Sequence, residues 1–459
     1  MGDASTFPDA GRRPMISTRK VVHISMLAFA FLLPFLSWGE AAGAALLALG
    51  FNLLVLPRLG VDLRKRTAGE ASEPQPTVWT GILAYPISVL ALVLLFGRRM
   101  EVVAAAWAMM ALGDGLASVV GVAWRGSRLP WSRGKTWPGF LTFIAAGSLG
   151  GFAVAHWTAP AVPDLRLLIL CAATALVGAV VETIPIGLDD NFSVPLVCGG
   201  FMFCASLIHW SAVESNLPYL GRRILLAVAV SGALALIALG LKTVNRSGAA
   251  LGFLVGVAVY MGYGYKSFLI LLTFFLVGSV ATRLGYAKKA ARGHAEGRGG
   301  ARSWREATAN SLAGAFFAVL VITTHYEAAF LVALVAAFAE AAGDTTSSEI
   351  GQWLSGRAYM ITTLKPVPAG QDGGISAGGS LAGLGATTLV VAVGYALGLC
   401  RPETAAIALG AGIAGNVLDS VLGATLEQRG LVTNGIVNFT GTAFAGGLAL
   451  GLMLTLHLI

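Results

Sequence analysis

The feature that most constrains this chain is a series of apolar runs, each near 20 residues long, that recurs along all 459 residues. About 20 consecutive apolar residues form a helix long enough to cross the hydrocarbon core of a bilayer. Only 12% of the residues are charged, against roughly 25% in soluble domains. The sequence therefore predicts an all-α, polytopic membrane protein with about 15 transmembrane helices. The expected spans are 22–38, 41–57, 79–97, 101–121, 137–157, 166–186, 194–212, 223–241, 248–264, 266–282, 307–323, 327–342, 379–400, 404–424 and 434–457.

The basic residues are distributed unevenly between the two sides of the expected membrane. If the N-terminus is cytoplasmic and the chain changes side at each span, 24 of the 31 Lys and Arg residues fall on the cytoplasmic side. Cytoplasmic loops carry such an excess, so the pattern predicts an N-in, C-out protein of the cell membrane. The net charge of +8 then reflects topology, and we expect the lipid bilayer, with no nucleic acid, as a partner.

Two short motifs indicate an internal repeat. GDGLASVVG at 113–121 and GDTTSSEIG at 343–351 are separated by 230 residues and share the pattern G-D-x-x-(A/S)-S-x-x-G. The alternative is a chance similarity between two glycine-rich apolar segments. The same offset separates two further pairs of charged residues, which are Lys135 and Lys365, and Asp189 and Asp419.

The repeat predicts two parallel seven-helix halves. Seven is an odd number, so a second copy would face the opposite way unless one additional helix joined the two halves. We expect a first membrane domain at 1–215, a linker transmembrane helix at 216–245 and a second membrane domain at 246–459.

Acidic residues stand between two apolar runs in the segment GLDDNFSVPL, at 187–196. Asp189 and Asp190 offer carboxylate oxygens and Asn191 offers an amide carbonyl; Mg²⁺ prefers such hard ligands together with substrate phosphates. A polar turn at the membrane surface is the alternative. Glu182, near the end of the preceding span, could join this site or pair with a cation of a loop.

The first copy of the repeated motif and the loop after it supply further polar groups. Asp114 and Ser118 are four residues apart and share one face of a helix. Arg133 and Lys135 are suited to binding phosphate, with Thr136 beside them. Anchoring charges at the cytoplasmic surface are the alternative for the basic residues.

A basic segment, RKVVH, precedes the first apolar run. Arg19, Lys20 and His23 are spaced so that they can share one helix face. His23 is a candidate general base for an alcohol, and the two basic residues are candidate phosphate ligands. A basic membrane anchor with a surface histidine explains the segment equally well.

The second half repeats this logic with other residues. Asp344, Glu349 and Asp419 offer carboxylates, and Lys365 offers a cation. The glycine-rich loop at 370–379 can present backbone N–H groups to phosphate, although a flexible linker is the alternative. The candidate nucleotide- or phosphate-binding residues of this half are Ser348, Gly370, Gly373, Gly374, Ser376, Asn416 and Ser420.

Two other features of the second half have simpler interpretations. Asn310 and Asn438 stand near expected helix ends, where capping is as good an explanation as binding. The basic stretch 283–305 is typical of a flexible loop over anionic lipid.

These motifs resemble those of two families. The N-terminal half, about 19–215, resembles the phytol kinase and dolichol kinase family, relatives of phosphatidate cytidylyltransferase, through RKVVH, GDGLASVVG, GKTWPG and VETIPIGLDDNFSVPL. The C-terminal half, about 240–457, resembles a family of formerly uncharacterised integral membrane proteins that includes the chloroplast phytyl-phosphate kinase. The motifs of this second resemblance are ATANSLAG, GDTTSSEIG, ITTLKPVPAGQDGGIS, GNVLDSVLGATLEQ and NGIVNFTGT.

The first resemblance implies CTP-dependent phosphorylation of an isoprenoid alcohol, and the second implies phosphorylation of the resulting monophosphate. The chain therefore resembles a fusion of two consecutive kinases that use CTP and Mg²⁺, with both sites facing the cytoplasm. A cytidylyltransferase of a membrane lipid, a transporter built on the parallel repeat, and a second half that only supports the first are the alternatives.

We assign roles to the candidate residues on this basis. In the first site Lys135 holds phosphate, and His23 or an aspartate accepts the proton of the alcohol. In the second site Lys365 and the 370–379 loop hold phosphate. The expected metal ligands are Asp114, Asp189 and Asp190 in the first site, and Asp344, Glu349 and Asp419 in the second.

Overall fold

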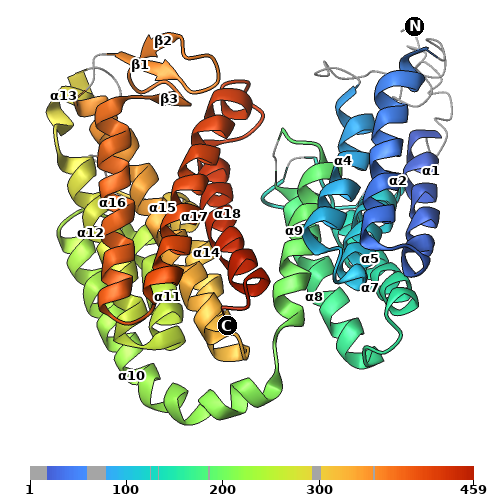
Figure 1. Ribbon diagram of the computed structural model, residues 1–459, viewed down its shortest axis with the longest axis horizontal. Helices are drawn as coiled ribbons and strands as arrows, with labels where there is room; N and C mark the ends of the chain where they lie inside the picture. Colours follow the sequence, from blue (N-terminus) through green and yellow to red (C-terminus); the bar gives the residue numbers. More distant parts are fainter. Residues whose placement is uncertain are drawn as a thin grey trace, which may run out of the picture. The chain divides into compact units, whose positions relative to one another are not determined.

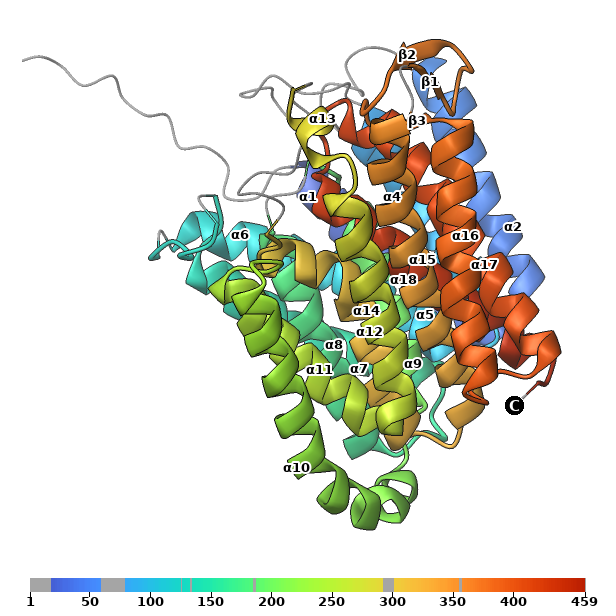
Figure 2. The ribbon, with the colours of Figure 1, turned by 90° about the vertical axis from the view of Figure 1, so that its left-hand side faces the viewer.

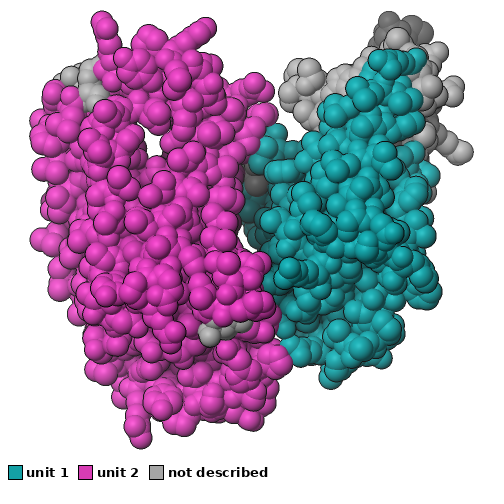
Figure 3. All heavy atoms as spheres, viewed as in Figure 1, with its two compact units in different colours: residues 1–206 teal, residues 207–459 magenta. Residues whose placement is uncertain are grey.

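The computed structural model describes residues 18–58, 79–124, 126–132, 134–184, 187–291, 301–354 and 357–458. The chain divides into two compact units, unit 1 at 1–206 and unit 2 at 207–459 (Figure 3). The expected spans are largely helical, although the span 194–212 crosses a break at 207–209. In the described part, 11 helices are long and apolar enough to cross a membrane. The prediction of an all-α polytopic membrane protein is therefore confirmed.

Unit 1 is organised around one continuous buried helix, Met100–Ala123. Residues 101–111 of this helix are all buried, and it packs against α7, α9 and η1. Its middle is a π-helix that ends at Asp114, so the chain geometry changes at the candidate ligand; π-helical segments are frequent at functional sites. The elements are α1 (Thr18–Ser25), η1 (Met26–Phe35), α2 (Trp38–Gly50), η2 (Phe51–Val55), η3 (Leu56–Arg58), α4 (Trp79–Phe96), α5 (Met100–Ala108), η4 (Met109–Asp114), α6 (Gly115–Ala123), α7 (Trp137–Thr158), α8 (Asp164–Thr183) and α9 (Asp190–Ser206).

Unit 2 is organised in the same way around α15 (Figure 1). Residues 329–343 of α15 are all buried, and α12, α14, α16, α17 and α18 pack around it. The elements are α10 (Trp210–Gly240), α11 (Arg246–Tyr263), α12 (Tyr265–Arg283), α13 (Tyr286–Ala291), α14 (Trp304–Thr323), α15 (Glu327–Leu354), β1 (Arg357–Met360), β2 (Pro366–Pro368), β3 (Gly374–Ile375), α16 (Ala377–Ala396), α17 (Pro402–Leu422), η6 (Gly423–Glu427) and α18 (Asn434–Thr455).

The segment expected to be a loop or linker after α15 contains a small antiparallel sheet. The strand order is β2-β1-β3, with Arg357 opposite Pro368 and Tyr359 opposite Ile375. The sheet lies over the ends of α15 and α16 (Figures 1 and 2). The 370–379 loop is therefore held by strand pairing and is not a flexible linker. The helix expected as a linker, α10, belongs to unit 2 and packs against α11 and α14.

The two units are equivalent at the 230-residue offset only in their central helices. After the loop that follows each central helix, residues 230 positions apart are no longer in equivalent positions. Asp114 and Asp344 both lie on the central helix of their unit. The third pair is not equivalent, because Asp189 precedes the start of α9 whereas Asp419 lies inside α17. The physical reason is the sheet, which lengthens the loop of unit 2 and shifts every later helix. The ungapped offset of 230 residues is therefore wrong for Asp189 and Asp419.

Candidate functional site

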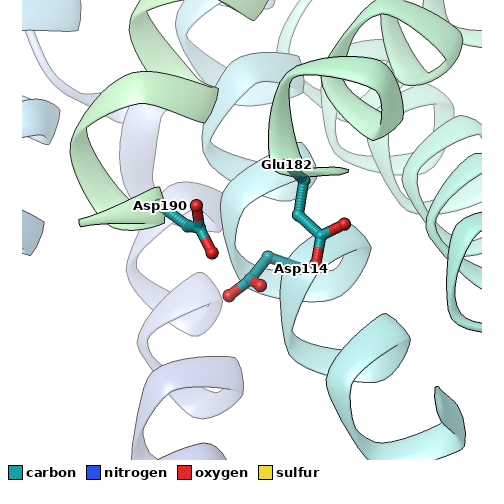
Figure 4. A group of neighbouring side chains, drawn as sticks. All are labelled: Asp114, Glu182 and Asp190. Atoms are coloured by element: carbon teal, nitrogen blue, oxygen red, sulfur yellow. The ribbon is translucent and has the colours of Figure 1, made fainter. Parts of the chain in front are cut away.

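Three carboxylates from different helices meet in unit 1. Asp114 ends η4, Glu182 is near the end of α8, and Asp190 begins α9. One oxygen of each lies within 4.8 Å of the others, and Figure 4 shows the three side chains pointing toward one another. Carboxylate oxygens at this spacing suit Mg²⁺, which is commonly held by one or two carboxylates together with phosphate oxygens. Within the described residues, this is the one such three-residue group.

Lys135 joins this acidic cluster from the loop between α6 and α7. Its Nζ donates to Glu182 Oε1 at 2.5 Å and to Asp190 Oδ2 at 3.3 Å. The loop is tied to the end of α8, because Trp131 Nε1 donates to Thr183 Oγ1 at 3.1 Å. Burial opposes the charge of Lys135, but the carboxylates of Asp190 and Glu182 outweigh it and raise the pKa of Lys135 above its ordinary value.

Lys20 and His23 reach the same cluster from α1. Lys20 Nζ lies 3.3 Å from Asp114 Oδ2 and donates to Ser118 Oγ at 2.9 Å. His23 Nε2 lies 3.7 Å from Asp114 Oδ2 and 2.8 Å from the carbonyl oxygen of Met110 in the π-helix. The ring of Tyr85 meets that of His23 edge-on, with centroids 5.2 Å apart. The cluster therefore combines metal-ligand chemistry with two lysines and a histidine.

Several residues expected in this site have other positions. Asp189 Oδ1 accepts from the backbone N–H of Asn191 at 3.0 Å, so Asp189 caps the start of α9 and is not part of the three-carboxylate group. Thr136 likewise caps α7, its Oγ1 accepting from Gly139 N at 3.4 Å. Asn191 is buried, and its Oδ1 has no hydrogen-bond partner in the described structure, so it remains a candidate ligand. Arg133 and the side chain of Arg19 lie outside the described residues.

Unit 2 contains a cavity of about 800 Å³ beneath the sheet, where Figure 3 shows the surface hollowed. Clefts that bind small ligands typically have this size. The cavity brings together most of the residues expected in the second site, which are Asp344, Ser348, Glu349, Gly370, Gly373, Gly374, Ser376, Asn416, Asp419 and Ser420.

Three helices begin at this cavity. Ser376 caps α16, Asn434 and Gly435 begin α18, and Arg305 lies in the first turn of α14. Helix N-termini favour anions because their backbone N–H groups and dipoles point outward. The guanidinium of Arg302, which is 8% exposed, also lines the cavity and stacks over the ring of Phe274. These groups suit a polyphosphate.

The cations of the second site differ from those expected. Lys365 is exposed in the turn between β1 and β2 and does not line the cavity, whereas Arg302 and Arg305 do. Both arginines fall in the stretch that the sequence indicates as a lipid-facing loop. Both arginines stand beside Ser303 and Glu306, which form the capping box of α14. This S-x-x-E pattern in the sequence could have placed them at a helix N-terminus.

Glu349 is also placed differently from the expectation. Its carboxylate pairs with the buried Lys289 of α13, which also donates to the carbonyl of Thr282 at 2.9 Å. Because that pair already neutralises Glu349, Asp344 and Asp419 are the better ligands for a cation. Their carboxyl groups interact directly, and Asp419 Oδ2 has no hydrogen-bond partner among the described residues.

Asn310 and Asn438, for which the sequence leaves capping and binding as alternatives, both line the cavity. Asn310 Nδ2 donates to the carbonyl of Glu306 at 3.0 Å, and Asn438 Nδ2 donates to Asn310 Oδ1 at 3.4 Å. They extend the polar lining between α14 and α18.

Comparison with known proteins identifies relatives of the chain. A family model described as integral membrane protein DUF92 matches residues 229–446, which lie within unit 2. An uncharacterized membrane protein of Synechocystis is 33% identical over 210 residues, covering 45% of this chain and 81% of that protein. The chloroplastic protein VTE6 of Arabidopsis thaliana is 36% identical over 189 residues, covering 40% of this chain and 57% of that protein.

A probable chloroplastic phytol kinase of Oryza sativa is 35% identical over 129 residues, covering 25% of this chain and 39% of that protein. No solved structure matches the chain. The family match and the extensive coverage of the Synechocystis relative show that this chain belongs to the integral membrane protein family DUF92.

Proposed function

We propose that this membrane protein is a lipid kinase that phosphorylates an isoprenoid alcohol in unit 1 and the resulting monophosphate in unit 2, using a nucleoside triphosphate. The observation that carries the proposal is the meeting of Asp114, Glu182 and Asp190 with Lys20, Lys135 and His23 in a membrane protein. The similarity to a probable phytol kinase supports an isoprenoid alcohol as the substrate.

Unit 1 has the groups that an alcohol substrate requires. The hydroxyl oxygen attacks the terminal phosphorus, a new O–P bond forms, and the bond between that phosphorus and the bridging oxygen breaks to release a nucleoside diphosphate. The alcohol loses its proton, for which His23 or Asp114 is the acceptor. Lys20 and Lys135 hold phosphate oxygens, and bound Mg²⁺ would neutralise charge on the phosphates.

Unit 2 has the groups that a monophosphate substrate requires. A phosphate monoester has its second pKa near 6, so it is largely dianionic at neutral pH and needs no general base. The described lining of the cavity accordingly contains arginine but neither histidine nor lysine. Arg302, Arg305 and the three helix N-termini hold phosphates, and Asp344 with Asp419 would hold Mg²⁺.

The finer features of the proposal rest on the sequence. CTP as the donor rests on the resemblance of the N-terminal half to the phytol kinase and dolichol kinase family. The cell membrane and the cytoplasmic orientation of both sites rest on the excess of Lys and Arg in alternate loops. A cytidylyltransferase would use the same groups but would leave a CDP-lipid as its product.

Incubation of the purified protein with Mg²⁺, phytol, farnesol or geranylgeraniol, and each labelled nucleoside triphosphate tests the proposal. Asp190→Asn should abolish formation of the monophosphate, and Asp419→Asn should let the monophosphate accumulate without diphosphate. If both variants still convert the alcohol to its diphosphate, the two-site assignment is wrong. A labelled CDP-lipid would identify the transferase alternative.

A further inference from the structure

Glu340 is a buried carboxylate that neither the sequence motifs nor the proposed reaction uses. It lies in the apolar run AAFAEAAG of α15 and is 1% exposed. Neither of its carboxylate oxygens has a hydrogen-bond partner in the part of the chain that the structure describes. An ionised carboxylate so placed is costly unless another charge compensates it.

The surroundings of Glu340 leave room for its carboxylate. A Cβ added at Gly415 of α17 would lie 2.7 Å from Glu340 Cγ, and one added at Gly441 of α18 would lie 2.4 Å from Glu340 Oε1. Two glycines on neighbouring helices therefore create the space that this side chain fills. Substituting either would force the carboxylate to move.

The neighbouring charges of Glu340 are negative. It interacts electrostatically with Asp344, one helical turn further along α15, and with Asp419 of α17. Of the ion pairs found between described residues, none involves these three carboxylates. In unit 1, by contrast, Lys20 and Lys135 contact the acidic cluster. No cation among the described residues pairs with the acidic group of unit 2, so either protonation or a bound cation neutralises it.

We propose that Glu340 completes, with Asp344 and Asp419, a divalent-cation site that fills before the nucleotide binds. The inference rests on the metal role proposed for Asp344 and Asp419 and adds a third carboxylate, one helical turn from Asp344 on α15. Carboxylate oxygens select hard cations such as Mg²⁺ or Mn²⁺. Unlike the group in unit 1, these carboxylates do not bring three oxygens within 4.8 Å of one another. Loading of the site is therefore expected to draw α15 and α17 together.

Binding of Mn²⁺ to the full-length protein without nucleotide, followed by electron paramagnetic resonance, tests the inference. Wild type should bind Mn²⁺, and Glu340→Gln should bind it about tenfold more weakly, as losses of metal-site groups commonly do. Glu403→Gln, which removes an exposed carboxylate from the start of α17, is the matched control and should bind as wild type does. Equal affinity of wild type and Glu340→Gln, or no nucleotide-free binding in wild type, would overturn the inference.

Hydrogen exchange and thermal unfolding of the same proteins give a second measurement. Mn²⁺ or Mg²⁺ should slow exchange in α15 and α17 of wild type but much less in Glu340→Gln. Without a divalent cation, Glu340→Gln should unfold at no lower temperature than wild type, because wild type must keep this buried carboxyl either protonated or uncompensated. A lower unfolding temperature would contradict the inference. Kinase activity is measured separately, so a protein that binds the cation but transfers no phosphate would overturn the proposed function alone.

Discussion

The acidic centres of the two units are neutralised in different ways. In unit 1, Lys20 lies 3.3 Å from Asp114, and Lys135 donates to both Glu182 and Asp190. In unit 2, Asp344 and Asp419 have no such partner among the described residues, and the buried lysine of that unit, Lys289, pairs with Glu349 instead. Ion pairs keep the cluster of unit 1 compensated without a metal ion, whereas the cluster of unit 2 must be neutralised by protonation or by a bound cation.

The largest effect is expected from Asp114→Asn, which removes the carboxylate that contacts Lys20 and His23 in unit 1. Because the alcohol must lose a proton, the rate of alcohol phosphorylation should fall by roughly 10²–10⁴-fold, the range of general-base contributions. Phosphorylation of supplied prenyl monophosphate should be unchanged. Product analysis with each substrate measures both rates, and a parallel loss of both would show that the units do not divide the reaction as proposed.

A smaller effect is expected when a cation of unit 2 is removed. The comparison is between Lys365, which the sequence predicts as a phosphate ligand, and Arg305, which lines the cavity. Arg305→Ala should raise the KM for the nucleotide in the monophosphate reaction about tenfold, equivalent to about 1.4 kcal/mol, since it removes a guanidinium from the cavity. Lys365→Ala should change this KM by less than about twofold, because an exposed charge outside the cavity contributes little. Steady-state kinetics with monophosphate as the substrate compares the two. A larger effect of Lys365→Ala would mean that the sheet closes over the bound nucleotide.

The smallest effect is expected on Mn²⁺ binding at unit 1, when one lysine of its acidic cluster is removed. Lys135→Gln removes the cation that competes with a metal ion for Glu182 and Asp190, so nucleotide-free Mn²⁺ binding at unit 1 should strengthen about fivefold. The comparison is made in a Glu340→Gln background to suppress binding in unit 2.

The pH dependence follows from the sign of the Lys135 shift. Its raised pKa keeps Lys135 charged below the ordinary lysine value, and the competing charge is lost only as pH rises through the raised pKa. Burial raises the pKa of Asp190 to about 6, so this carboxylate is ionised above pH 8. Wild type should therefore show no gain in Mn²⁺ binding at unit 1 between pH 8 and 9. A gain in that window would show that Lys135 is not the competing charge.

Much of the fold was predictable because a membrane imposes a simple length and polarity requirement on each helix. Asp114, Lys135 and Asp190 were also predictable as site residues, since Asp114 lies inside an apolar run and the other two border one. Asp189 was not distinguishable from Asp190, because only the start of α9 decides which of two adjacent carboxylates caps the helix.

The remaining differences arise from contacts between segments distant in the sequence. The pairing of Glu349 with Lys289 joins residues 60 positions apart and could not be inferred from either motif. Lys365 was assigned from a repeat whose register the sheet interrupts. Glu340 lies outside the sequence motifs. It could still have been identified from the sequence, because an acidic residue inside an apolar span is itself evidence of function.

The close approach of Gly415 and Gly441 to Glu340 has an evolutionary consequence. Since even a methyl group at either position would collide with the Glu340 side chain, the three sites cannot drift independently. Lineages that acquire alanine or serine at position 441 are expected to have already replaced the acid at 340 with a shorter residue. Natural variation among descendants of this gene would therefore record whether the buried acid is still needed.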